Sequence, residues 1–222
     1  MKKTLLAVVA AFAAVSGAHA ASASASTGLL DTDFTQGLAL GPLAPPVPLG
    51  ATLDSATFTF SGGFASTLTA LNTSNSSTNV FNRISSLNLD LLFGTTVLSN
   101  LSLNIWDVPN TTLGVSGGGS DFADFGSSTG NDSIMFTSTD AGLLAALGAG
   151  TGVFSCDAFV QSSGRDGGGN VRVVQTTQAE CGINVDVAFT VAPPPAVPEP
   201  SALALVGIAL AGLAFTARRR KV

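Results

Sequence analysis

The chain has 222 residues and a formal charge of −5, but its charged residues are unevenly distributed. Six of its nine basic residues lie near the two ends, so residues 21–197 contain three arginines, no lysine and thirteen acids, a formal charge of −10. Because phosphate binding needs a basic surface, this composition excludes nucleic acid as a partner, whereas divalent cations and neutral polysaccharide remain compatible with it.

The first 20 residues have the organisation of a secretory signal peptide. Lys2 and Lys3 form a basic start, residues 4–15 are largely apolar, and residues 18–20 (Ala-His-Ala) form a small-x-small cleavage site. We therefore predict that the protein is exported and that its mature chain begins at Ala21.

Residues 21–191 are predicted to form one exported, mainly β domain, a single antiparallel β-sandwich or jelly-roll-like fold. The stretch is long enough for one domain with its own core. Gly, Ser, Thr and Asn are abundant, which favours strands and turns over helices. The alternative is a partly disordered, low-complexity secreted chain, but an alternation of apolar and polar residues argues against it for most of the length.

That alternation identifies the expected strands. The clearest strand lies at residues 181–191, where six apolar side chains share one face. Residues 87–93 and 101–105 alternate in the same way, and Gly94 and Thr95 between them indicate a hairpin. Shorter candidate strands lie at residues 57–60, 132–136, 153–160 and 171–175.

One helix is expected among these strands, at residues 141–147, with Asp140 as its N-cap and Gly148 at its end. Four prolines between residues 42 and 48 predict an extended connector or a sheet edge. The triple glycines predict flexible loops at residues 117–119 and 167–169.

The two cysteines, Cys156 and Cys181, are predicted to form a disulfide. Export takes the chain to an oxidising compartment, and the apolar alternation around each cysteine points both side chains into one core from neighbouring strands. Two buried free thiols are the alternative. A thioredoxin-like redox pair is excluded, because its cysteines are separated by only two residues.

The composition argues against most catalytic centres. The only histidine, His19, lies in the predicted signal peptide, and residues 21–197 also lack lysine and tyrosine. This excludes Ser-His-Asp and Cys-His arrangements and imidazole-based zinc sites, so we predict no catalytic residue, no cofactor and no metal ligand. Carboxylate chemistry on glycans is the alternative, with Asp90, Asp107 and Asp186 as candidates for which a solvated role is favoured.

Two further groups of residues could contact a ligand. Asp31, Asp33 and the acidic, Gly-rich residues 117–132 supply the oxygen ligands that Ca²⁺ prefers, although turn chemistry explains them better. Trp106 could stack on a sugar ring, but a position in the core is favoured for this side chain.

Residues 192–222 combine three segments in a strict order. A Pro-rich spacer at residues 192–200 ends in Val197, Pro198, Glu199 and Pro200; an uncharged apolar run follows at 201–217; and a basic end at 218–222 contains Arg218, Arg219, Arg220 and Lys221. As a helix, the run would cover about 26 Å, close to the ~30 Å hydrocarbon core of a bilayer.

The apolar run is therefore predicted to be a single transmembrane helix. The basic residues after it should remain cytoplasmic, which leaves the upstream domain on the outer face of the inner membrane. A buried core helix is the alternative, but such a helix has no reason to end in three arginines.

The tripeptide Pro198, Glu199 and Pro200, the apolar run and the basic end together resemble the PEP-CTERM sorting signal of Gram-negative bacteria. The resemblance implies that an exosortase-type membrane processing enzyme recognises the tail, and it implies a link to exopolysaccharide and biofilm matrix. It covers only the last 26 residues and implies nothing about the preceding domain.

We therefore predict an exported cell-surface or extracellular-matrix protein with a structural or exopolysaccharide-associated role rather than an enzymatic one. Before processing it would be anchored in the inner membrane and face the periplasm, and afterwards it would reach the cell surface or the extracellular space. A carbohydrate- or calcium-binding surface module is the alternative function, and a carboxylate-based glycan hydrolase is a less favoured one.

Overall fold

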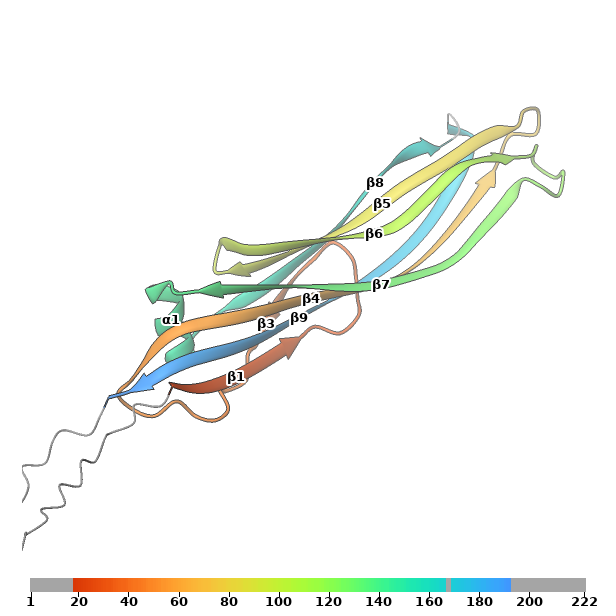
Figure 1. Cartoon of the computed structure of the whole chain (residues 1–222). Helices are drawn as coiled ribbons and strands as arrows, with labels where there is room; N and C mark the ends of the chain where they lie inside the picture. Colours follow the sequence, from red (N-terminus) through yellow and green to blue (C-terminus); the bar gives the residue numbers. More distant parts are fainter. Residues whose placement is uncertain (1–17, 167–168, 193–222) are drawn as a thin grey trace, which may run out of the picture.

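The computed structural model of the chain describes residues 18–166 and 169–192. Two antiparallel β-sheets pack face to face as a sandwich (Figure 1). The prediction of a mainly β sandwich is confirmed. The predicted membrane helix, sorting residues and basic end lie outside the described residues, as does the predicted signal peptide up to residue 17.

The first sheet has the strand order β1-β9-β4-β7, and β2 also pairs with β9. Its strands are β1 (Ala18–Ser26), β2 (Leu30–Asp31), β4 (Ala51–Asn72), β7 (Phe122–Ser138) and β9 (Val171–Val191). The second sheet has the order β3-β8-β5-β6. Its strands are β3 (Phe34–Leu38), β8 (Phe154–Asp166), β5 (Asn79–Phe93) and β6 (Thr96–Leu113).

The sandwich is elongated because its central strands are long. β4 has 22 residues and β9 has 21, so β4 spans about 70 Å at roughly 3.3 Å per residue. The two strands pair from Ala51 opposite Val191 to Asn72 opposite Val171.

The predicted strand boundaries were therefore wrong in this region. Residues 171–175 and 181–191 belong to one strand, β9, and residues 57–60 are only a short part of β4. The apolar alternation of β9 stops at Gln175 and Thr177, but both side chains find hydrogen-bond partners inside the molecule, so the strand continues. The strands β1, β2 and β3 were not predicted.

The two ends of the sandwich differ. We call the end where β9 finishes at Val191 the tail end; it carries α1 (Ala141–Gly148) and the loop between β3 and β4 (Figure 1). The opposite end, which we call the far end, carries the β4–β5, β6–β7 and β8–β9 connections. Every long strand therefore runs between these two ends.

The predicted hairpin and helix are confirmed. Gly94 and Thr95 join β5 to β6, and Gly94 adopts the positive φ of 60° that its turn requires. The Asp140 carboxylate caps α1 by accepting a hydrogen bond from the Leu143 amide at 2.8 Å. Gly148 is still helical, however, and Gly150 with φ of 65° is the first residue after the helix in the left-handed region.

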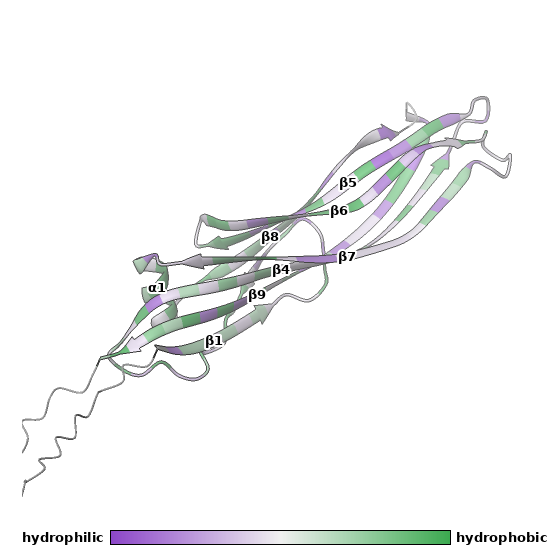
Figure 2. Ribbon diagram, viewed as in Figure 1, coloured by the Kyte–Doolittle hydropathy of each residue, from purple (hydrophilic) through white to green (hydrophobic). Residues whose placement is uncertain are grey.

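Two clusters of buried side chains fill the sandwich, and hydrophilic bands lie between hydrophobic ones along its strands (Figure 2). The tail-end cluster is the larger and contains Phe58, Phe60, Leu87, Leu89 and Val185 among others. The far-end cluster consists of Leu68, Ala70, Phe81, Val108 and Leu113. The tail half therefore holds most of the hydrophobic core.

Candidate functional site

The tail end fixes the point at which the predicted sorting segment leaves the sandwich. Val191, the last residue of β9, pairs with Ala51 at the start of β4. Beside this pair, the Thr190 hydroxyl donates to Oδ2 of Asp54 at 2.7 Å. The chain thus leaves β9 only seven residues before Pro198. Within the described part of the chain, no helix has the length and apolar character to cross a membrane.

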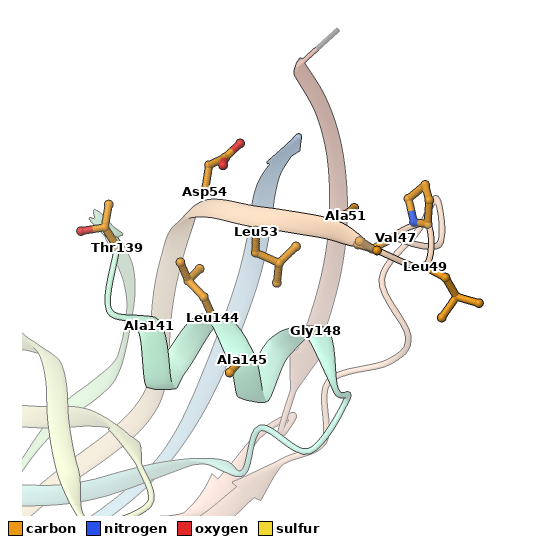
Figure 3. Close-up of a pocket in the computed structure, with 12 residues that line it drawn as sticks. Val47, Leu49, Ala51, Leu53, Asp54, Thr139, Ala141, Leu144, Ala145 and Gly148 are labelled. Carbon is orange, nitrogen blue, oxygen red and sulfur yellow. The ribbon is translucent and has the colours of Figure 1, made fainter. Parts of the chain in front are cut away.

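A groove of about 670 Å³ lies beside this exit, between residues 47–51 and α1. The Leu53 and Leu144 side chains approach each other inside it, whereas Leu49 points away into solvent (Figure 3). Asp54 and Thr139 supply the only polar side chains of the lining. Asp54 is the one carboxylate among these lining residues, whereas most glycoside hydrolases use a pair of carboxyl groups.

The predicted disulfide between Cys156 and Cys181 is confirmed. Cys156 lies on β8 and Cys181 on β9, so the bond joins the two sheets rather than neighbours within one sheet, with a Cα–Cα distance of 6.5 Å. Both residues are buried in the tail-end cluster. The bond therefore links the two sheets of the sandwich within the larger hydrophobic cluster.

A belt of polar groups separates the two hydrophobic clusters. It comprises Ser66, Arg83, Ser85, the Trp106 indole N–H, Gln175 and Thr177. We call this set the polar belt. Its members come from β4 and β9 in one sheet and from β5 and β6 in the other.

Gln175 is the centre of the polar belt. Its Oε1 accepts hydrogen bonds from Arg83 Nε at 2.9 Å and from the Ser85 hydroxyl at 3.1 Å, and its Nε2 donates to Thr177 Oγ1 at 3.2 Å. Buried polar groups cost little when they are hydrogen-bonded and much when they are not. The belt is therefore stable only when both sheets are in the correct register.

Trp106 belongs to the polar belt and to the core. Its indole Nε1 donates to the Ser66 hydroxyl at 3.0 Å, and its ring packs against both hydrophobic clusters. The expectation that Trp106 anchors the core is thus supported over a sugar-stacking role. Sequence reasoning missed the belt, although Gln175 and Thr177 share the inward parity of Cys181 and so could have signalled it.

The structure does not bring the candidate carboxylates together. Asp90 lies on β5 and Asp107 on β6, whereas Asp186 is in the other sheet, where it accepts a hydrogen bond from Asn184 at 3.0 Å. Asp90 instead lies directly opposite Asp157 in the β5–β8 pair of strands. Like charges directly opposite one another destabilise a sheet, and Oδ1 of Asp157 is buried without a hydrogen-bond partner.

The candidate calcium ligands stabilise loop and strand backbone. Asp121 Oδ2 accepts from the Gly117 amide at 3.0 Å, and Asp124 Oδ1 accepts from the Gly126 amide at 2.8 Å. Asp33 Oδ1 accepts from a backbone amide of β8. In residues 18–166 and 169–192, no three His, Cys, Asp or Glu side chains are grouped so that they could hold a metal ion.

A buried asparagine organises the far end. The Asn72 side-chain nitrogen donates to the carbonyls of Ser77 and Gly114, at 2.9 and 2.6 Å, and its oxygen accepts from the Ser74 amide and from Asn79 Nδ2. All of its hydrogen-bonding capacity is thereby used. One amide side chain thus ties two far-end connections together, a role that its position in the sequence did not reveal.

Comparison with protein-family models places a known signal on the tail. Residues 196–221 match the PEP-CTERM protein-sorting motif, in agreement with the resemblance drawn from the sequence. The fold and this motif together define an exported β-sandwich protein. The match implies more specifically that the chain is an exosortase-sorted protein, directed to the membrane and the cell surface.

Other comparisons add little about the sandwich itself. No curated protein matches the chain. Among solved structures, the chain resembles infectious bursal disease virus strain Gx at 13% identity and a TM-score of 0.17, and a VP2 subviral particle of that virus at 12% and 0.16. The matches cover 88% and 86% of this chain but 47% and 48% of the viral chains, so the chain spans about half their length.

Proposed function

We propose that the protein is a non-enzymatic structural component of the cell surface or the extracellular matrix, and that it associates with exopolysaccharide. The observation that carries this proposal is the PEP-CTERM motif, which begins five residues after the last strand of a long, rigid sandwich. A sorting tail of this kind is useful to a protein that is retained in the envelope or passes through it.

The geometry supports a projecting role. The tail segment leaves from one end of a sandwich whose longest strand spans about 70 Å. The far-end connections therefore lie well away from the anchoring point, where they can meet material outside the cell. The disulfide and the polar belt both join the two sheets, which gives such a projecting domain stiffness.

The surface chemistry supports a polysaccharide partner. The outward face of β6 carries exposed amide and hydroxyl side chains, including Asn100, Ser102 and Asn104. These groups both donate and accept hydrogen bonds, as sugar hydroxyls require. Together with the dispersed carboxylates, they favour a binding or structural role over hydrolysis.

Deleting residues 198–221 tests the sorting part of the proposal. We expect the truncated protein to be exported but to accumulate in a different fraction from the full chain, as judged by immunoblotting of periplasm, membrane and culture medium. Deletion of a stretch of similar length from the signal peptide should block export altogether and serves as the comparison. An unchanged distribution of the truncated protein would contradict the proposal.

Binding and turnover assays test the functional part. We expect the purified protein to be retained on the exopolysaccharide of the producing cells without releasing sugars, and deletion of its gene to change biofilm or surface properties. Release of reducing sugar that is abolished by Asp90→Asn, Asp107→Asn or Asp186→Asn would replace the structural role by the hydrolase alternative.

A further inference from the structure

Two segments at the tail end of the sandwich consist of apolar residues and glycine alone. Residues 41–50 have the sequence GPLAPPVPLG, and α1 has the sequence AGLLAALG, so neither segment contains a polar side chain. Leu49 is 104% exposed, and its side chain points away from α1 (Figure 3). We call residues 41–50 together with α1 the apolar end.

The fold holds these two segments at the surface. Ala44 exchanges two backbone hydrogen bonds with Ser22 of β1, at 2.8 and 2.9 Å, and the Ala51 amide donates to the Pro48 carbonyl at 3.1 Å. Leu143, Leu144 and Leu147 bury one side of α1 in the tail-end cluster. The exposed side of α1 is left with the small residues Ala141, Ala145 and Gly148.

The apolar end lies beside Val191, where the chain leaves the sandwich toward the predicted membrane segment. Ala51, the residue after the loop, pairs with Val191, and the nine residues 192–200 separate Val191 from the start of the apolar run at residue 201. Even fully extended, at about 3.6 Å per residue, the ten steps from Val191 to residue 201 would cover only about 36 Å. The apolar end is therefore held within this distance of the bilayer.

We propose that the apolar end is a membrane-contact surface, and that Leu49 and the neighbouring loop residues insert among the lipids at the outer face of the inner membrane. This inference rests on the proposed function, in which the tail anchors the chain before processing. A tether this short keeps the effective concentration of the loop at the bilayer high, so that a small apolar contact suffices. The sandwich would then stand on its tail end with the far end directed outward.

The charged residues near the apolar end indicate whether the membrane contact is apolar or electrostatic. Asp54 and Asp140 flank the apolar end, and the three arginines of the domain, Arg83, Arg165 and Arg172, lie in the polar belt or the far half. Attraction to anionic headgroups needs basic side chains near the surface. The contact is therefore apolar, and it should depend neither on anionic lipid nor on salt.

Tryptophan fluorescence in membranes tests this inference on the full chain. The Leu49→Trp variant is reconstituted through its tail into phosphatidylcholine vesicles, with and without bromine on the acyl chains. Thr78→Trp, in an exposed far-end loop, is the matched control, and the wild-type signal of the half-buried Trp106 is subtracted from both. We expect a blue-shifted Leu49→Trp emission that brominated lipid quenches, and an unshifted, unquenched Thr78→Trp emission.

Flotation of the vesicles separates the two proposals. If the protein floats but Leu49→Trp is not quenched, the membrane contact is wrong while the anchor stands; a blue shift without quenching would mean that protein, such as a second copy, covers Leu49. If the protein does not float, the anchoring tail and the contact both fail. Quenching that requires phosphatidylglycerol, or that disappears in high salt, would overturn the apolar contact as well.

Discussion

The tail half and the far half of the sandwich are built from the same strands but are stabilised differently. The tail half combines the larger hydrophobic cluster with the disulfide and with the packed side of α1. The far half has five buried apolar residues and depends on the hydrogen bonds of Asn72 to hold its loops. Because burial of apolar surface is the dominant stabilising term, we expect the tail half to be the more resistant to local unfolding.

The polar belt lies between these halves and keeps them in one register. Each of β4, β5 and β9 carries apolar side chains on both sides of its belt residues. If one sheet slid along the other, the belt residues of the two sheets would no longer face each other. Their polar groups would then be buried without hydrogen-bond partners. We therefore expect the belt to contribute more to the specificity of strand pairing than to stability.

The largest expected effect comes from removing one buried phenylalanine from each cluster. Phe58 and Phe81 are both fully buried, one in each cluster. Phe58→Ala should lower the free energy of unfolding by about 3–5 kcal/mol, measured by urea denaturation. Phe81→Ala should cost less, because the small far-end cluster can collapse around the cavity, and hydrogen exchange should show faster opening in the far half alone. Equal costs and uniform exchange would contradict the comparison.

Removing the disulfide should weaken the tail half next most. The bond closes a loop with a sequence separation of 25, for which the chain-entropy estimate is about 3–4 kcal/mol. Cys156→Ala with Cys181→Ala should lower the melting temperature about as much as reduction of the wild-type protein does. Thiol counting under denaturing conditions checks that the wild type contains no free thiol; two free thiols in exported material would refute the bond.

A pair of glutamines in β9 tests the polar belt. Gln175→Leu leaves the groups of Arg83 and Ser85 that it binds without this partner, and should cost about 1–3 kcal/mol of unfolding free energy. Gln178→Leu, an exposed position on the opposite face of the same strand, is the matched control and should change stability little. If the two variants are equally stable, the belt has no energetic role.

The smallest expected effect is a gain in stability within the tail half. Asp157 faces Asp90 directly across the β5–β8 ladder, and its Oδ1 is buried without a partner. Asp157→Asn removes the like-charge pair and should raise the free energy of unfolding by about 0.2–1 kcal/mol. The same substitution at the exposed Asp186 is the control; a loss of stability in Asp157→Asn would show that this carboxylate makes a favourable interaction after all.

The sequence by itself determined the features that depend on local patterns. Alternation along residues 87–93, 101–105 and 181–191 predicted strands, the Gly94–Thr95 turn predicted the hairpin that joins the first two, and Asp140 predicted the start of α1, because strand faces, turns and caps each involve residues near one another in the chain. The same parity rule and the oxidising compartment predicted the disulfide. The sorting tail could be identified because its tripeptide, apolar run and basic end follow one another directly in the sequence.

Only the tertiary structure decided how distant residues meet. It merged two predicted strands into β9, because Gln175 and Thr177 find partners on β5 and β4 that no local pattern specifies. It also placed the uncharged loop and α1 beside the exit of the tail, since the pairing of Ala51 with Val191 joins residues 140 positions apart. Such contacts depend on strand order and register, which long-range packing and hydrogen bonding select and a single sequence does not display.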